Sequence, residues 1–341
     1  MKIGILTHPQ STNYGGILQC YALCTYLRKL NHEPIVIQRV ANKSFFLWSI
    51  VRNLLRVCHF PRYYRPETVD RMVNIRPFIQ KHLARTEPVN SQNKMKKVCQ
   101  KYGLDAVIVG SDQVWRHDYA MKYGFNYFLD FVPDDVVKAS YAASFGLSDW
   151  QYTHGETEII KQLLDRFKGI SVREEDAVSL IKDNTGKNAL QLIDPTMLLK
   201  QEDYDNITSH RLVKEKYVFV YWLGDKNLIA SAIERYKTEG YTIVNINLRD
   251  ICEQISVEDW LSYIKYADYV ITDSFHGCVF SIIFERQFIA FGNKSGGNSR
   301  IMSLCKMFGF EPETRKQYFN VDNNLDIHRQ KTYNYINKVL D

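Results

Sequence analysis

The segment YVITDSFHGCVFSIIF, from Tyr269 to Phe284, places polar side chains between two apolar runs. The first run has the pattern of a buried strand that ends at Asp273, and the second has that of a helix that begins near Gly277. Ligands of open α/β sheets bind beyond the carboxyl ends of the strands, where the next helix favours phosphate or carboxylate. We therefore predict an anion site formed by Ser274, His276 and Gly277. The alternative is that Ser274 only caps the helix and that His276 is a half-buried structural residue.

Two further segments supply cations. FGNKSGGNSRIMSL follows another predicted strand, and Lys294, the flexible Gly296-Gly297 pair and Arg300 would close over the same anion. The spacing is not that of a P-loop, and an ordinary surface loop is the alternative.

In GISVREEDAV, Arg173 stands at a strand end and can bind a carboxylate or phosphate through two parallel hydrogen bonds. The acids at 174–176 complement the positive pole of the next helix, and an ion pair between Arg173 and these acids is the alternative.

Two loops of the N-terminal half are expected to open onto the same crevice. They are THPQSTNYGG, after the first predicted strand, and GSDQVW, after the strand DAVIV. Both loops are polar, contain glycine and carry an aromatic residue, which suits a sugar with hydroxyls on its rim and an apolar ring face. Ordinary turn chemistry is the alternative. The residues that we assign to the acceptor side on this basis are Asn13, Tyr14, Gly15, Asp112, Gln113 and Trp115.

The elements that must position these residues alternate between strand and helix along the chain of 341 residues. This pattern is typical of parallel sheets, and the length favours two domains. We predict an α/β fold with two Rossmann-like domains that face a central cleft. The polar stretch 200–216 is the linker candidate. The predicted divisions are an N-terminal acceptor-side domain at 1–200, a C-terminal donor-side domain at 201–325 and a closing helix at 326–341.

The alternation lapses at about 43–86, where we predict a helical insertion in the N-terminal domain. The stretch SFFLWSIVRNLLRVCHFPRYYRP mixes aromatic, aliphatic and basic residues. A helical hairpin packed on the domain is the favoured interpretation. The alternative is peripheral contact with a membrane surface by residues 45–65.

The composition narrows the class of protein. The 44 Lys and Arg residues against 38 Asp and Glu give a net charge of +6, which fits an anionic partner, but no nucleic-acid-binding signature is present. Without an apolar run long enough to span a bilayer or a leader pattern, we expect a cytoplasmic protein.

The seven cysteines contain no C-x-x-C pair, so we expect reduced thiols. Cys20 and Cys24 fit buried core positions better than a zinc site, and no metal site is predicted.

Seven segments occur in the order found in the polysaccharide pyruvyl transferase family, which the sequence resembles over most of its length. They are YGGILQCYAL, VGSDQVW, YAASFG, ISVRE, DPTMLL, ADYVITDSFHG and FGNKSGGNSR. The resemblance implies a GT-B-like pair of facing domains and transfer of pyruvate from phosphoenolpyruvate to a sugar as a cyclic ketal. Some members carry Arg-Leu-His where this chain has Ser274-Phe275-His276. The loss of that cation shifts the binding of donor phosphate to Arg173, Lys294 and Arg300.

The implied reaction needs an acid and a base, because C3 of the enol is protonated while a sugar hydroxyl attacks C2. We assign the donor-side proton to His276, whose charge state responds to both the helix pole and the bound phosphate. Asp112 is the predicted acceptor-side base. Phosphoenolpyruvate is the donor substrate, and no cofactor or metal is expected. The acceptor is a sugar of a polysaccharide or of a lipid-linked oligosaccharide, the latter at the inner membrane face.

Two other functions fit the same residues. A GT-B-type glycosyltransferase would use the anion-binding helix for the diphosphate of a nucleotide sugar. A non-catalytic protein that binds a sugar or an anion would show binding without turnover.

Overall fold

The computed structural model describes residues 1–40, 70–224, 229–246, 254–292, 298–311, 313, 315–317 and 321–341. The N-terminal half is built on a parallel four-stranded sheet in the order β2-β1-β3-β4. A short parallel pair, β5-β6, extends this half, and bridges from Ala139 and Ala143 join it to the region of β4. The strands are β1 (Lys2–Leu6), β2 (Glu33–Val36), β3 (Ala106–Val109), β4 (Val137–Ser140), β5 (Ser171–Val172) and β6 (Leu190–Gln191).

Most helices of this half lie in the connections between its strands, and η3 and α9 follow β6. Helix α1 joins β1 to β2, as the apolar spacing of YGGILQCYALCTYLRK predicts. The α-helices are α1 (Tyr14–Lys29), α3 (Arg76–His82), α4 (Gln92–Met95), α5 (Val98–Tyr102), α6 (His117–Ala120), α7 (His154–Leu164), α8 (Glu175–Thr185) and α9 (Gln201–Asp205). The 3-10 helices are η1 (Met121–Tyr123), η2 (Asn126–Phe128) and η3 (Pro195–Leu198).

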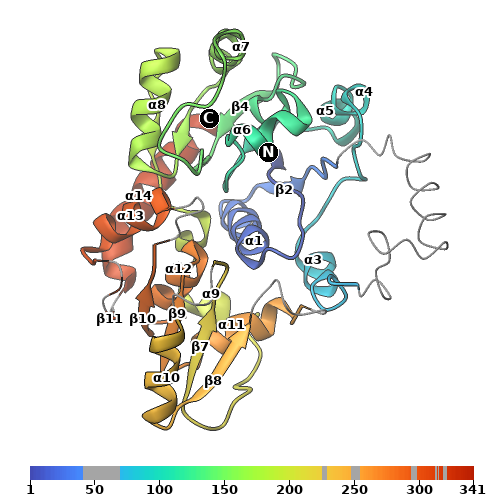
Figure 1. Ribbon diagram of the computed structural model, residues 1–341. Helices are drawn as coiled ribbons and strands as arrows, with labels where there is room; N and C mark the ends of the chain where they lie inside the picture. Colours follow the sequence, from blue (N-terminus) through green and yellow to red (C-terminus); the bar gives the residue numbers. More distant parts are fainter. Residues whose placement is uncertain are drawn as a thin grey trace, which may run out of the picture.

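The C-terminal half is a second sheet in the order β11-β10-β9-β7-β8 (Figure 1). Its pairings are parallel except that of β10 with β11. The strands are β7 (Tyr217–Tyr221), β8 (Thr242–Ile246), β9 (Tyr269–Thr272), β10 (Gln287–Ala290) and β11 (Arg315–Lys316). The helices are α10 (Ala230–Thr238), α11 (Val257–Lys265), α12 (Phe275–Ile283), α13 (Asn298–Phe308) and α14 (Val321–Leu340).

This architecture confirms the predicted α/β class with two facing Rossmann-like halves. The central strands β3 and β7 are buried along their whole length, as expected for parallel strands covered on both faces. Their continuous apolar runs, AVIV and YVFVY, are the reason that both could be recognised in the sequence. The predicted linker 200–216 contains α9, whose Tyr204 is fully buried, so this stretch is partly packed structure.

The last helix, α14, returns to the N-terminal half. The hydroxyl of Tyr335 donates to the carbonyl of Ser140 at 2.6 Å, and Thr332 lies within hydrogen-bond distance of Tyr141. The C-terminus consequently ends near β4 (Figure 1). The predicted closing helix is therefore present, and it begins at Val321.

Some predictions concern residues outside the described part of the chain. Residues 41–69, which include the membrane-contact candidate 45–65, are among them; the described end of the predicted insertion contains α3. Within the described ranges, no helix has the length and hydropathy needed to cross a membrane, and no group of His, Cys, Asp and Glu residues forms a metal site. The described cysteines, which include Cys20 and Cys24, are free and buried.

Gly169 allows α14 to pack closely, and this gives a test of the fold. A Cβ at this position would lie 2.6 Å from Cγ2 of Val339 and 2.9 Å from the hydroxyl of Tyr335. We expect Gly169→Ala to lower the free energy of unfolding by about 1–3 kcal/mol through overpacking, measured by urea denaturation. The control is Gly155→Ala in exposed helical structure, where the added methyl meets no atom; equal effects of the two substitutions would contradict the account.

Candidate active site

Arg173 lies at the carboxyl end of β5 and is buried between the two halves. Its Nη1 donates to Oδ2 of Asp194 at 2.7 Å, and its guanidinium carbon lies 4.7 Å above the ring of Phe275 from the C-terminal half. The Nε and Nη2 atoms have no hydrogen-bond partner. Their nearest described carboxylates are Glu174 at 3.5 Å and Asp112 at 3.8 Å, which is beyond normal hydrogen-bond length.

The two unpaired nitrogens lie on one edge of the guanidinium. This edge is the one through which arginine binds a carboxylate or phosphate with two parallel hydrogen bonds. Buried donors without a partner cost free energy, so the edge is suited to an anionic ligand. Of the acids at 174–176, which the sequence offered as ion-pair partners, Glu174 lies 3.5 Å from Nε of Arg173. The short hydrogen bond of Arg173 is the one to Asp194.

Arg300, from α13, reaches the same cluster. Its Nη1 lies 3.9 Å from Oδ1 of Asp112, and its Nε is buried without a hydrogen-bond partner. Burial, followed by repulsion from Arg173, lowers the pKa of the Arg300 guanidinium. An anion placed between the two arginines would relieve this repulsion.

Three carboxylates surround the arginines. Burial raises the pKa of Glu174 even though Arg173 opposes the shift, and its Oε1 accepts from the hydroxyl of Ser144. Burial also raises the pKa values of Asp112 and Asp194. Interactions with neighbouring cations outweigh burial, so both pKa values lie below the ordinary range. Two ionised carboxylates therefore keep the cationic cluster near neutrality before any ligand binds.

His276 lies at the contact between the halves. A Cβ built on Gly15 of α1 would fall 2.0 Å from Nδ1 of His276, so the imidazole occupies the space that any larger residue at position 15 would need. Its Nε2 is buried, has no hydrogen-bond partner and lies 3.7 Å from Oδ2 of Asp194. His276 thus joins Arg173 and Arg300 as a third group with an unpaired donor or acceptor.

Ser274 and Gly277 have structural contacts of their own, and their predicted roles in binding the donor stay predictions. Ser274 caps α12, because its hydroxyl oxygen accepts from the backbone N–H of Gly277 at 3.4 Å. A Cβ at Gly277 would lie 2.3 Å from Oγ1 of Thr272, so this glycine is needed for close packing of helix on strand. The alternative of a simple cap holds for Ser274 in this structure.

A narrow cavity separates the two sides of the cluster. It is lined by Arg173, Glu174 and Asp194 on one side and by Phe275 and Arg300 on the other, and its volume is about 10 Å³. That volume holds about one water molecule. In this arrangement of side chains the cavity is too small for a larger anion.

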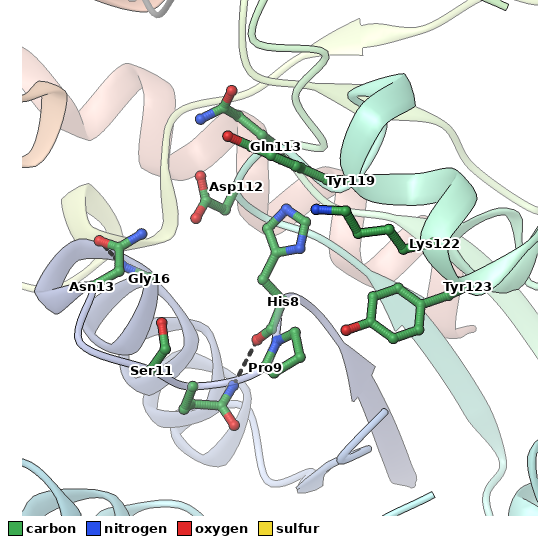
Figure 2. Close-up of a pocket in the computed structure, with 11 residues that line it drawn as sticks. His8, Pro9, Ser11, Asn13, Gly16, Asp112, Gln113, Tyr119, Lys122 and Tyr123 are labelled. Carbon is green, nitrogen blue, oxygen red and sulfur yellow. Dashed lines mark hydrogen bonds between the residues drawn. The ribbon is translucent and has the colours of Figure 1, made fainter. Parts of the chain in front are cut away.

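A second cavity of about 310 Å³ lies at the carboxyl ends of β1 and β3 in the N-terminal half. Figure 2 shows Asp112 on one wall and Lys122 on the other, with His8 between them. Asp112 has a left-handed backbone with φ of 70°, a strained conformation that clusters at functional sites. The side chains around the cavity are those of His8, Pro9, Gln10, Ser11, Asn13, Asp112, Gln113, Tyr119, Lys122 and Tyr123.

Only some of the predicted acceptor-side residues line the second cavity. Asn13, Asp112 and Gln113 line the second cavity, although Asn13 also caps α1 and Gln113 accepts from Arg116. Gly15 instead makes room for His276.

Tyr14 and Trp115 do not reach the cavity. Tyr14 is buried and stacks on Trp260 of the C-terminal half, with ring centroids 5.4 Å apart. Trp115 is buried against Phe128, and its indole N–H donates to the carbonyl of Tyr127. Protein atoms cover both rings, so neither lines the cavity in this structure.

The sequence was compared with models of known protein families. The model described as polysaccharide pyruvyl transferase matches residues 13–295, a range that includes Arg173, His276 and most of the second cavity. The chain belongs to the polysaccharide pyruvyl transferase family.

Other comparisons give more distant likenesses to this pyruvyl transferase family member. The UDP-GlcNAc 2-epimerase of Methanocaldococcus jannaschii is 14% identical, with a TM-score of 0.49 over 98% of this chain and 100% of that one. HepE of Anabaena, solved with UDP and glucose, is 11% identical, with a TM-score of 0.45 over 100% and 92% of the two chains. Similarity at this level transfers no substrate. No curated protein matches the sequence.

Several residues at the candidate site were not predicted from the sequence. Asp194 lay within a family segment, DPTMLL, but its ionic role becomes visible only when η3 is placed beside Arg173. His8 stands in the loop THPQ, and Lys122 follows the GSDQVW loop in an unremarkable stretch. A polar residue just after a predicted strand is the signal that could have identified His8. Lys294 lies outside the described residues, so its role stays a prediction.

Gly15 provides a test of the placement of His276. Gly15→Ala must displace the imidazole, and we expect pyruvyl transfer to fall about 10²-fold, since displacements near 1 Å have effects of this size. The control is Gly155→Ala in α7, where an added Cβ meets no atom. Rates of transfer and urea unfolding of both variants would be measured. Equal rates for the two variants would show that the Gly15 contact does not position His276.

Proposed function

We propose that this protein transfers pyruvate from phosphoenolpyruvate to two hydroxyls of a sugar, forming a cyclic ketal and releasing phosphate. The observation that carries the proposal is the unpaired Nε and Nη2 edge of Arg173, buried beside Arg300 and His276 at the contact between the halves. Membership of the pyruvyl transferase family supports the same reaction class.

The donor suits this cluster because it carries a carboxylate and a phosphate close together. Arg173 can hold either group through two parallel bonds, and Arg300 then neutralises the other. Charge that develops on the departing phosphate is stabilised by donors already in place. In the proposed reaction the donor itself supplies the leaving group, so the account invokes no metal and no cofactor.

The second cavity is the proposed acceptor site. Its polar lining and its volume of about 310 Å³ suit a sugar. Asp112 belongs to both sites, because its carboxylate lines this cavity and also lies 3.8 Å from Arg173 and 3.9 Å from Arg300. A hydroxyl bound beside Asp112 would therefore face a donor held by the arginines.

Donor binding requires an opening movement under this proposal. The cavity beside Arg173 holds about one water molecule, which is far less than phosphoenolpyruvate needs. The contacts that must loosen are those of Phe275 and Arg300 with the N-terminal half. Closure over the donor would then exclude water from the reacting atoms.

The direct test combines binding and turnover. We expect phosphoenolpyruvate at 100 times its dissociation constant to stabilise the protein by about 2.7 kcal/mol in thermal unfolding, and nucleotide sugars to have no such effect. With a panel of galactose, glucose, mannose and their N-acetyl derivatives, as free sugars and as lipid-linked oligosaccharides, phosphate should be released and the acceptor should gain one pyruvyl ketal by mass. Stabilisation by a nucleotide sugar alone would favour a glycosyltransferase instead, and binding of phosphoenolpyruvate without turnover would favour a non-catalytic anion-binding protein.

His276 is proposed to deliver the proton to C3 of the donor. We expect His276→Ala to lower kcat by about 10²-fold with little change in KM for phosphoenolpyruvate, because a proton carrier acts in the transition state. Steady-state kinetics at saturating acceptor would measure both constants. A larger change in KM than in kcat would refute the acid role and leave His276 as a binding residue.

A further inference from the structure

His8 lies in the loop that follows β1, beside the loop that follows β3. The two strands pair in parallel, with Leu6 opposite Val109, so both chains leave the sheet at the same edge. The hydroxyl of Thr7 donates to the carbonyl of Ser111 at 3.0 Å and ties the loops together. This pairing brings His8 and Asp112 to the same cavity.

The ring of His8 is held at its edges and has one free nitrogen. Tyr119 and Tyr127 contact it edge-on, with centroids 5.5 and 5.4 Å away. Its Nδ1 lies 3.5 Å from the hydroxyl of Tyr127, whereas its Nε2 is buried without a hydrogen-bond partner. Figure 2 shows the imidazole at the centre of the lining side chains. This nitrogen lacks a hydrogen-bond partner, which a group bound in the cavity could supply.

Two charged side chains of the lining flank this imidazole. Asp112 attracts a positive imidazole, and after burial this interaction with His8 is the largest influence on the pKa of Asp112, which it lowers. Lys122 lies on the opposite wall of the cavity (Figure 2). A neutral imidazole next to an ionised carboxylate is the arrangement in which histidine accepts a proton and the carboxylate stabilises the resulting cation.

We propose that His8 is the catalytic base that accepts the proton of the sugar hydroxyl, with Asp112 as its charge partner. This inference rests on the proposed function and changes the assignment of the base. Asp112 alone is a weak base because the guanidinium groups of Arg173 and Arg300, 3.8 and 3.9 Å from its Oδ1, favour its ionised form. Histidine is the side chain that most often serves as a general base.

The proposed steps balance in protons and electrons. In the first step the hydroxyl oxygen forms a bond to C2, its proton passes to Nε2 of His8, and the electron pair of the C2–C3 double bond takes a proton from His276 to give the methyl group. In the second step the other hydroxyl closes on C2, and phosphate leaves with the electron pair of the C2–O bond. The proton of this second hydroxyl and the one held by His8 restore His276 and protonate the phosphate. Both hydroxyl protons are thereby accounted for, and the protein returns to its starting state.

The test compares His8→Gln and His8→Ala with His117→Gln in the full-length protein. Glutamine keeps a polar side chain but cannot carry the proton, and alanine leaves room for an added imidazole. His117 is a half-buried imidazole of the same half that lies outside the cavity lining and contacts Glu156 at 3.3 Å. The readouts are kcat, KM for phosphoenolpyruvate, thermal unfolding, and the rate of His8→Ala in imidazole buffer, with the acceptor that wild type uses best.

We expect both His8 variants to lose about 10²-fold or more in kcat with KM for phosphoenolpyruvate unchanged. Imidazole should restore part of the rate of His8→Ala, and His117→Gln should behave as wild type. Rates within about threefold of wild type, or lost activity that imidazole does not restore in a folded His8→Ala protein, would overturn the role of His8 while the proposed function stands. Wild-type protein that forms no ketal with any acceptor would overturn both.

Discussion

The constraint on which this site depends is a buried arginine that is only half paired. Asp194 satisfies one end of Arg173 at 2.7 Å and thereby fixes the guanidinium plane, while the Nε and Nη2 edge stays open toward Arg300. Leaving buried donors unpaired costs free energy, and the flanking carboxylates compensate in part through charge alone. An anion that enters between the arginines would supply the missing hydrogen bonds, so the affinity for a ligand is built into the folded state.

The packing between the halves places the reacting groups around this arginine. Phe275 covers one face of the guanidinium, and the next residue, His276, fits against the bare backbone of Gly15. The stacked rings of Tyr14 and Trp260 hold the same faces together. Because residues from both halves complete the cluster, the proposed donor site depends on how the halves pack. The proposed acceptor cavity is lined by residues of the N-terminal half alone.

Strand and helix alternation predicts most of the fold, because apolar runs such as AVIV and YVFVY have few interpretations in a chain of this length. Arg173, His276 and Asp112 could be predicted as site residues because each stands just beyond a strand, and the structure brings them into one cluster. It could not show that Tyr14 is committed to packing against Trp260, because stacking on protein and stacking on sugar need the same residue type. The importance of Asp194 and His8 depends on contacts between segments far apart in the chain, which no local pattern contains.

The most direct measurement is a crystal structure of the protein with phosphoenolpyruvate bound. The account predicts the carboxylate or phosphate of the donor within hydrogen-bond distance of Nε and Nη2 of Arg173, with Arg300 and His276 against the same molecule and the halves separated enough to admit it. A donor bound away from Arg173, or a bound complex in which that edge still has no partner, would contradict the central claim.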